Sequence, residues 1–97
     1  MSKIVIVAKI KIKEQFKDEV YTELLALHKS THDLDQGCIQ YELHKDLEDA
    51  YSFTFIETWE TSQLLEVHMS TTHFASFAKT IENKLEALEI SKLEKLI

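Results

Sequence analysis

The spacing of apolar residues switches along the chain between the period of a β-strand, two residues, and that of an α-helix, about 3.6 residues. Residues 3–12 alternate as a strand does, whereas residues 13–33 carry apolar side chains three or four positions apart, which predicts an amphipathic helix. Residues 38–45 and 51–59 alternate again, with a polar hairpin loop predicted at 46–50. This order of elements limits the possible folds more than any single motif does.

The second half of the chain contains signals for helix starts. Thr61 or Ser62 can cap a short helix over 62–69, and Ser70-Thr71-Thr72 offers a second N-cap. The helix after that break is predicted to carry an apolar stripe made of Phe74, Phe77, Ala78, Ile81, Leu85 and Leu88. The tail over 89–97 alternates poorly, and we predict a final strand there because the topology requires one.

The predicted order is strand, helix, strand, strand, helix, strand, which is the split β-α-β arrangement. We therefore expect a single domain over residues 1–97 with an α+β, ferredoxin-like fold, an antiparallel sheet and helices on one face. In the second strand, Ile39, Tyr41 and Leu43 are expected to share a face, and Gly37 before it suits a positive φ.

The first strand is apolar on both faces, because Val5 and Val7 alternate with a row of isoleucines and an alanine. A strand of this kind is covered on both sides. The helices of the chain can cover one side, and Val5, Val7 and Ile56 would leave an apolar patch on the other. We therefore expect a homodimer that buries this second face.

Charge and composition exclude several classes of partner. The chain has 17 acidic and 11 basic residues and a net charge of −6, whereas nucleic-acid-binding proteins present a basic surface. No segment approaches the roughly 20 apolar residues of a membrane span, and Lys9 interrupts the first apolar stretch too early for a signal peptide. With the single cysteine Cys38, these features predict a cytoplasmic protein that binds neither nucleic acid nor membrane.

Glu57 is the most informative residue for function, because it stands in a row with Phe53, Phe55 and Trp59 on the face assigned to the helices. Burying a carboxylate is costly unless it is protonated, paired or hydrogen-bonded. Glu57 is therefore either a satisfied structural acid or a pocket group that can act as a base.

The histidines offer fewer constraints. His68 lies on the apolar side of the short helix, as a packing residue or a proton acceptor, and His73 stands in the first turn of the next helix, where a capping role is expected. His28 and His32 are four apart, but no cysteine or acid is placed to complete a metal site. One glycine cannot form a phosphate-binding loop. We therefore expect neither metal nor cofactor.

Three segments together resemble the antibiotic biosynthesis monooxygenase (ABM) family. They match Gly-x-x-x-Tyr at Gly37–Leu43, Phe-x-x-x-Glu-x-Trp at Phe53–Trp59, and His-x-x-x-x-His-Phe at His68–Phe74. The resemblance implies a dimeric α+β barrel with a pocket between sheet and helices. It places Glu57 and His68 as catalytic candidates, and as substrate-binding residues Tyr41, Phe55, Trp59, His73, Phe74 and Phe77.

The same resemblance implies cofactor-independent oxidation of a quinol or phenol by molecular oxygen, with Glu57 or His68 as the base. Haem-degrading relatives use an Asn in the first strand and a later Trp, where this chain has Ala8 and His68, so haem is not expected. Two alternatives stay open: a proton-transfer isomerase acting on a small metabolite, similar to autoinducer-processing relatives, and a dimeric ligand-binding module without catalysis.

Overall fold

The computed structural model describes residues 3–97; residues 1 and 2, which belong to the predicted domain, lie outside the described residues. In chain order the elements are β1 (Ile4–Ile12), the 3-10 helix η1 (Glu14–Phe16), α1 (Lys17–Leu34), β2 (Cys38–Lys45), β3 (Ser52–Trp59), α2 (Ser62–Met69), α3 (Thr72–Ile81) and β4 (Leu85–Glu94).

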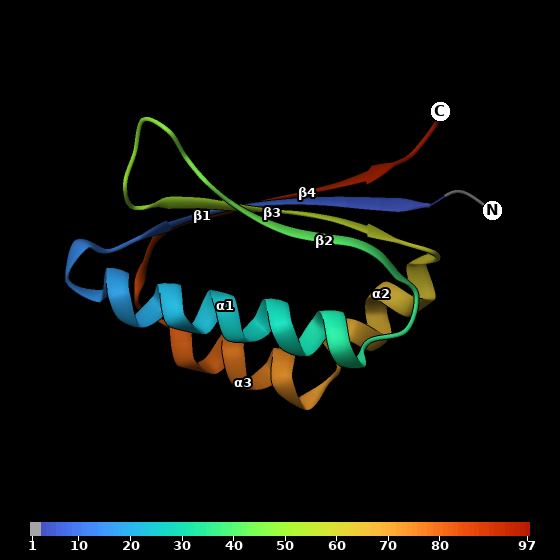
Figure 1. The fold of residues 1–97 in the computed structure, drawn as a ribbon, viewed down its shortest axis with the longest axis horizontal. Helices are drawn as coiled ribbons and strands as arrows, with labels where there is room; N and C mark the ends of the chain where they lie inside the picture. The colour runs from blue at the N-terminus through green and yellow to red at the C-terminus, as the bar shows by residue number, and fades with distance from the viewer. Residues whose placement is uncertain (1–2) are drawn as a thin grey trace.

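The four strands form one antiparallel sheet in the order β2-β3-β1-β4. Figure 1 shows α1 and α3 lying side by side beneath this sheet, with α2 at one end and the other sheet face free of helices. This arrangement confirms the predicted α+β, ferredoxin-like fold with helices on one face of an antiparallel sheet.

The core lies between the sheet and α1. Alternate residues of β1 and β3 point toward the helices, among them Ile10, which pairs with Phe53 in the register of the two strands. From the other side Val20 and Leu24 of α1 are fully buried against them. The row predicted for the third strand, including Glu57, therefore faces the helices.

The helix predicted to run through Leu88 ends instead at Ile81. Asn83 has a φ of 66°, a left-handed conformation that stops a helix and that Asn tolerates better than most residues. Leu85 and Leu88 belong to β4, which therefore begins four residues before the predicted position 89 and pairs along β1. Their helical spacing was coincidental, yet Leu88 pairs with Ile10 and so still faces the helix side.

Ile39 was wrongly predicted to share a face with Tyr41 and Leu43. The register of β2 against β3 shifts between Cys38 and Gln40, which places an extra residue in β2. As a result Ile39 is 52% exposed while Tyr41 is buried. Gly37, immediately before the strand, has the expected positive φ of 80°.

The sheet face opposite the helices, hereafter the bare face, contains the partly exposed side chains of Val5, Val7 and Ile56. Leu93 of β4, which pairs with Val5, is 49% exposed on the same face. No helix of the described residues has both the length and the apolar character to cross a membrane.

Candidate functional site

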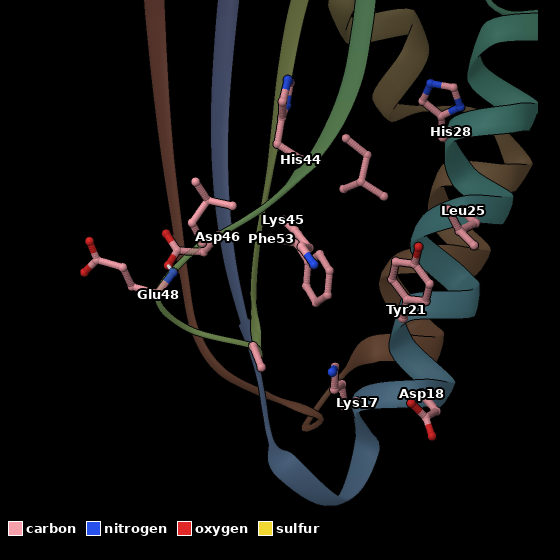
Figure 2. A pocket seen from close by; sticks show the side chains of 13 residues that line it. Lys17, Asp18, Tyr21, Leu25, His28, His44, Lys45, Asp46, Glu48 and Phe53 are labelled. Atoms are coloured by element: carbon pink, nitrogen blue, oxygen red, sulfur yellow. Dashed lines mark hydrogen bonds between the residues drawn. The ribbon is translucent and has the colours of Figure 1, made fainter.

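An open trough of about 890 Å³ lies between the first half of α1 and the hairpin of β2 and β3. Figure 2 shows that charged side chains such as Lys17, Asp18 and Asp46 surround it. Phe53 is its only buried lining residue. The trough is therefore lined mainly by solvent-exposed side chains, with no buried ionisable group among them.

The second cavity, of about 470 Å³, lies between the sheet and helices α2 and α3. Most of its wall is apolar, as is usual for small-molecule sites. Of the residues proposed from the sequence, those that line it are Tyr41, Phe55, Glu57, His68, Phe74 and Phe77. Trp59 and His73 lie outside the lining, although both contact residues near it.

Glu57 is a buried carboxyl group, 6% exposed, on the wall of this cavity. The indole Nε1–H of Trp59 donates a hydrogen bond to Oε1 of Glu57 at 2.9 Å. Trp59 therefore holds this carboxyl group from outside the cavity lining. Burial raises the pKa of Glu57 to about 7, and the Trp59 hydrogen bond partly opposes this. Glu57 can therefore give up or accept a proton near neutral pH.

Tyr41 forms an aromatic wall next to Glu57. Its ring centroid lies 5.0 Å from that of Phe55 and 5.6 Å from that of His68. Burial, followed by the charge of Glu57, raises the pKa of the Tyr41 phenol far above its ordinary value. The phenol therefore stays protonated and acts as a wall and a hydrogen-bond group, rather than as a base.

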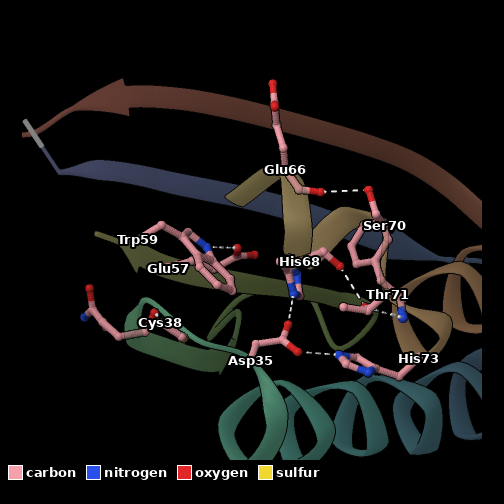
Figure 3. Close-up of polar contacts among 11 residues, drawn as sticks. Asp35, Cys38, Glu57, Trp59, Glu66, His68, Ser70, Thr71 and His73 are labelled. Atoms are coloured by element: carbon pink, nitrogen blue, oxygen red, sulfur yellow. Dashed lines mark hydrogen bonds and ion pairs between the residues drawn. The ribbon is translucent and has the colours of Figure 1, made fainter. Parts of the chain in front are cut away.

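His68 is 2% exposed and packs at the end of α2 with its ring centroid 4.5 Å from that of Trp59. Its Nδ1 is hydrogen-bonded to Asp35 Oδ2 (Figure 3). Burial lowers the pKa of His68, and the bond to Asp35 partly opposes this. Its Nε2 is buried and has no hydrogen-bond partner within residues 3–97.

Asp35 is the residue that sequence analysis missed. It lies just after α1, its side chain is 4% exposed, and its second oxygen, Oδ1, lies 2.9 Å from His73 Nε2. The two groups lie close together but lack hydrogen-bond alignment. The predicted capping role of His73 was wrong, because the Thr71 side chain accepts the α3 N-cap hydrogen bond. The only sequence signal for Asp35 was its place in the turn before Gly37.

Asp35, His68 and His73 also present ligand atoms within 4.8 Å of one another. Two imidazoles and a carboxylate are a donor set that zinc or iron accepts. Here, however, each imidazole contacts a different oxygen of the one carboxylate, an arrangement typical of a shared acceptor. His28 and His32 stack on each other with ring centroids 6.1 Å apart, and the ring of His28 also lies 6.0 Å from that of Tyr41.

Comparison with known proteins places this architecture in a family. The family model of the antibiotic biosynthesis monooxygenases (ABM) matches residues 3–80. The solved structure of PA3566 from Pseudomonas aeruginosa is 31% identical, with a TM-score of 0.92 over 100% of this chain and 97% of that chain. A conserved protein from Methanosarcina mazei Go1 is 27% identical, with a TM-score of 0.90 over 99% of this chain and 95% of that chain.

A protein of Caulobacter crescentus CB15, described provisionally as an antibiotic biosynthesis monooxygenase, shares the fold. It is 20% identical, with a TM-score of 0.92 over 99% of this chain and 92% of that chain. No curated protein shows significant sequence similarity to the chain. On the match over residues 3–80 and the likeness to PA3566, the chain belongs to the antibiotic biosynthesis monooxygenase family.

Proposed function

We propose that the protein is a cofactor-independent monooxygenase that oxidises a quinol or phenolic small molecule with molecular oxygen. Membership of the family supports a monooxygenase-like function in general. The observation that carries the finer proposal is Glu57, a buried carboxyl group with a pKa of about 7 on the wall of an aromatic cavity. Such a group can remove the proton of a bound phenol, and this makes the ring electron-rich enough to reduce oxygen.

The cavity suits a flat ring in size and shape. Its volume of about 470 Å³ falls in the range of small-molecule sites, and Phe55, Phe74 and Phe77 supply aromatic surface around it. Glu57 and His68 meet this surface from β3 and from α2, so two proton acceptors reach one cavity. A bound ring that fills this mostly apolar cavity would also displace water from around the reactive anion.

The reaction balances without an external reductant when the substrate is a hydroquinone. The base takes the proton of one hydroxyl group, and the resulting anion transfers electrons to oxygen. One oxygen atom forms a new bond to ring carbon, and the other leaves as water with two hydrogens from the substrate. The ring, oxidised to a hydroxyquinone, supplies all the electrons. Glu57 or His68 holds the first proton and returns it to the departing oxygen.

The test is oxygen consumption by chelator-treated protein over a panel of hydroquinones and phenols. We expect the wild type to consume oxygen above the autoxidation rate. Replacing the residue that acts as the base, by Glu57→Gln or His68→Gln, should reduce this rate on the order of 10²–10⁴-fold. Glu66→Gln, an exposed acid of α2, is the matched control and should behave as the wild type. No uptake with any substrate would contradict the proposal. Uptake at the wild-type rate in both pocket variants would also contradict it.

A second candidate function is proton-transfer isomerisation of a small metabolite. It is favoured by one observation, namely that two groups able to exchange protons, Glu57 and His68, face the same cavity. An isomerase would incorporate deuterium from D₂O into its substrate without consuming oxygen. Detection of oxygen uptake coupled to product formation would decide against it.

We also propose that the protein is a homodimer joined through the bare face. Val5, Val7 and Ile56 lie partly exposed there, and a second copy would bury the same apolar side chains on both partners. Val7→Lys should yield a monomer in sedimentation velocity, whereas Val67→Lys, at a 60% exposed valine on α2, should not. A wild-type protein that is monomeric at micromolar concentration would contradict the dimer.

A further inference from the structure

The carboxylate of Asp35 joins two histidines that come from different helices. Its Oδ2 is hydrogen-bonded to Nδ1 of His68 at the end of α2, and its Oδ1 lies 2.9 Å from Nε2 of His73 at the start of α3 (Figure 3). Asp35 itself does not line the cavity. It can therefore influence the chemistry of the site through His68, the cavity residue to which it is hydrogen-bonded.

The contact with Asp35 decides which nitrogen of His68 carries the proton. An ionised carboxylate has no hydrogen to donate, so a hydrogen bond between the two groups requires a hydrogen on Nδ1. A neutral imidazole carries one hydrogen only, which leaves Nε2 with its lone pair. That nitrogen is buried and has no partner within residues 3–97, and the ring to which it belongs lines the cavity. An unpartnered buried acceptor of this kind calls for an explanation.

A buried carboxylate needs a partner, and the side chain of Asp35 is only 4% exposed. No lysine among residues 3–97 forms an ion pair with it. His73 is the more exposed of its two histidines, at 20% against 2% for His68. Of the three groups, His73 is therefore the one that meets solvent, while His68 meets the cavity.

We propose that Asp35 is a positioning residue that holds His68 as the Nδ1–H tautomer and so leaves Nε2, on the ring of a residue that lines the cavity, as the proton acceptor. Of Asp35, His68 and His73, His73 is the residue that exchanges protons with solvent. When a substrate O–H bond breaks, its proton forms a new N–H bond at Nε2, the hydrogen on Nδ1 stays in place, and Asp35 stabilises the resulting imidazolium. This catalytic consequence rests on the proposed function, whereas the tautomer does not.

The first experiment measures the tautomer directly by ¹H–¹⁵N NMR of the imidazole rings in the resting protein. We expect His68 to show a protonated Nδ1 and an unprotonated Nε2. Asp35→Asn should abolish this pattern, because the amide can donate to Nδ1 and so stabilise the opposite tautomer. Asp33→Asn, two residues earlier at a half-exposed carboxylate paired with Lys29, is the matched control and should leave it unchanged.

His73→Gln tests whether His73 is the residue that exchanges protons with solvent. It should retain the His68 tautomer but slow the exchange of the Nδ1 hydrogen with water, since the exchanging imidazole has been removed. An unchanged exchange rate would overturn the role assigned to His73. If the wild type carries its hydrogen on Nε2, the assignment to Asp35 is overturned without any variant having to fold.

Zinc titration of chelator-treated protein provides a further decisive outcome. Stoichiometric binding that is lost in Asp35→Asn would mean that the three residues form a metal site, which overturns the proposal; absence of binding supports it.

The last experiment measures oxygen uptake. With an active substrate, Asp35→Asn should lower kcat on the order of 10²–10⁴-fold with little change in KM, because the ring remains but its acceptor nitrogen is lost. A predominantly raised KM, or an unchanged kcat, would contradict a positioning role in catalysis. If no substrate is consumed but the expected tautomer is found and depends on Asp35, the monooxygenase proposal fails while the positioning role stands.

Discussion

Glu57→Gln should change the way in which stability depends on pH. The pKa of Glu57 is raised from its ordinary value of 4.5 to about 7, mainly by burial. Between these two values the folded protein keeps a proton that the unfolded chain has lost. Stability of the wild type therefore falls as pH rises through this window and is level above it. A glutamine has no proton to lose, so the variant lacks this fall.

The size of the effect follows from the shift. A change from 4.5 to about 7 at about 1.4 kcal/mol per pKa unit corresponds to about 3–4 kcal/mol over the whole window. From about pH 5.5 to about pH 8, roughly 2 kcal/mol of this remains to be measured. Trp59 can still donate its hydrogen bond to the glutamine oxygen, so the variant should keep the local geometry.

The assay is urea unfolding of both proteins at several pH values and one fixed protein concentration, because a dimer would make stability depend on concentration. The useful quantity is the difference between variant and wild type. The lowered pKa of His68 makes both proteins lose stability below its ordinary value of 6.5, and this contribution cancels in the difference. Glu66→Gln, at an exposed position, should show a constant difference.

A difference between Glu57→Gln and wild type that does not change between about pH 5.5 and about pH 8 would refute the reasoning, because the carboxyl group would then titrate alike in both states. If the stability of the variant minus that of the wild type instead falls with rising pH, the sign is opposite, that is, the fold stabilises the carboxylate. The charge of Glu57 also contributes to the pKa values of Cys38 and Tyr41. Both values are raised, so both groups stay protonated in this pH range.

Substitutions at two further positions test the backbone that shapes the site. Gly37→Ala should destabilise the protein by at least about 2 kcal/mol in urea unfolding, since its φ is 80° and an added Cβ would lie 2.4 Å from Leu64 Cδ1. Loss of less than about 1 kcal/mol would mean that the turn relaxes easily. Asn83→Gly should leave stability within about 0.5 kcal/mol, whereas Asn83→Ala should cost about 1 kcal/mol, because only alanine resists the left-handed conformation. Equal effects of the two would contradict this account of how α3 ends.

The fold could be predicted because its main determinants are local. Period-two alternation marks β1 and β3 whatever lies around them, and Thr61 and Thr71 accept the N-cap hydrogen bonds of α2 and α3 from the immediately following turn. Both signals depend on residues fewer than ten positions apart. They placed Glu57 on the helix side of the sheet and His68 on the inner side of its helix.

The errors arose where one local pattern fits two structures. Leu85 and Leu88 are spaced as on a helix, but the conformation of a single residue, Asn83, ends α3 and turns the chain into β4. Similarly, alternation in β2 could not reveal the register shift that exposes Ile39, since a bulge depends on pairing with the neighbouring strand. In both places, pairing between distant segments overrides the local period.

Asp35 illustrates why the chemistry of the site was harder to predict than its walls. It is 33 residues from His68 in sequence and belongs to neither a helical stripe nor an alternating run. Its contact exists only because α1 ends where α2 and α3 meet beneath the sheet. Aromatic walls follow from the strand pattern that builds the core, whereas the carboxylate that fixes a proton on His68 is brought there by the tertiary fold. Under the proposal for Asp35, the position of a loop acid therefore decides which nitrogen of His68 can act as a base.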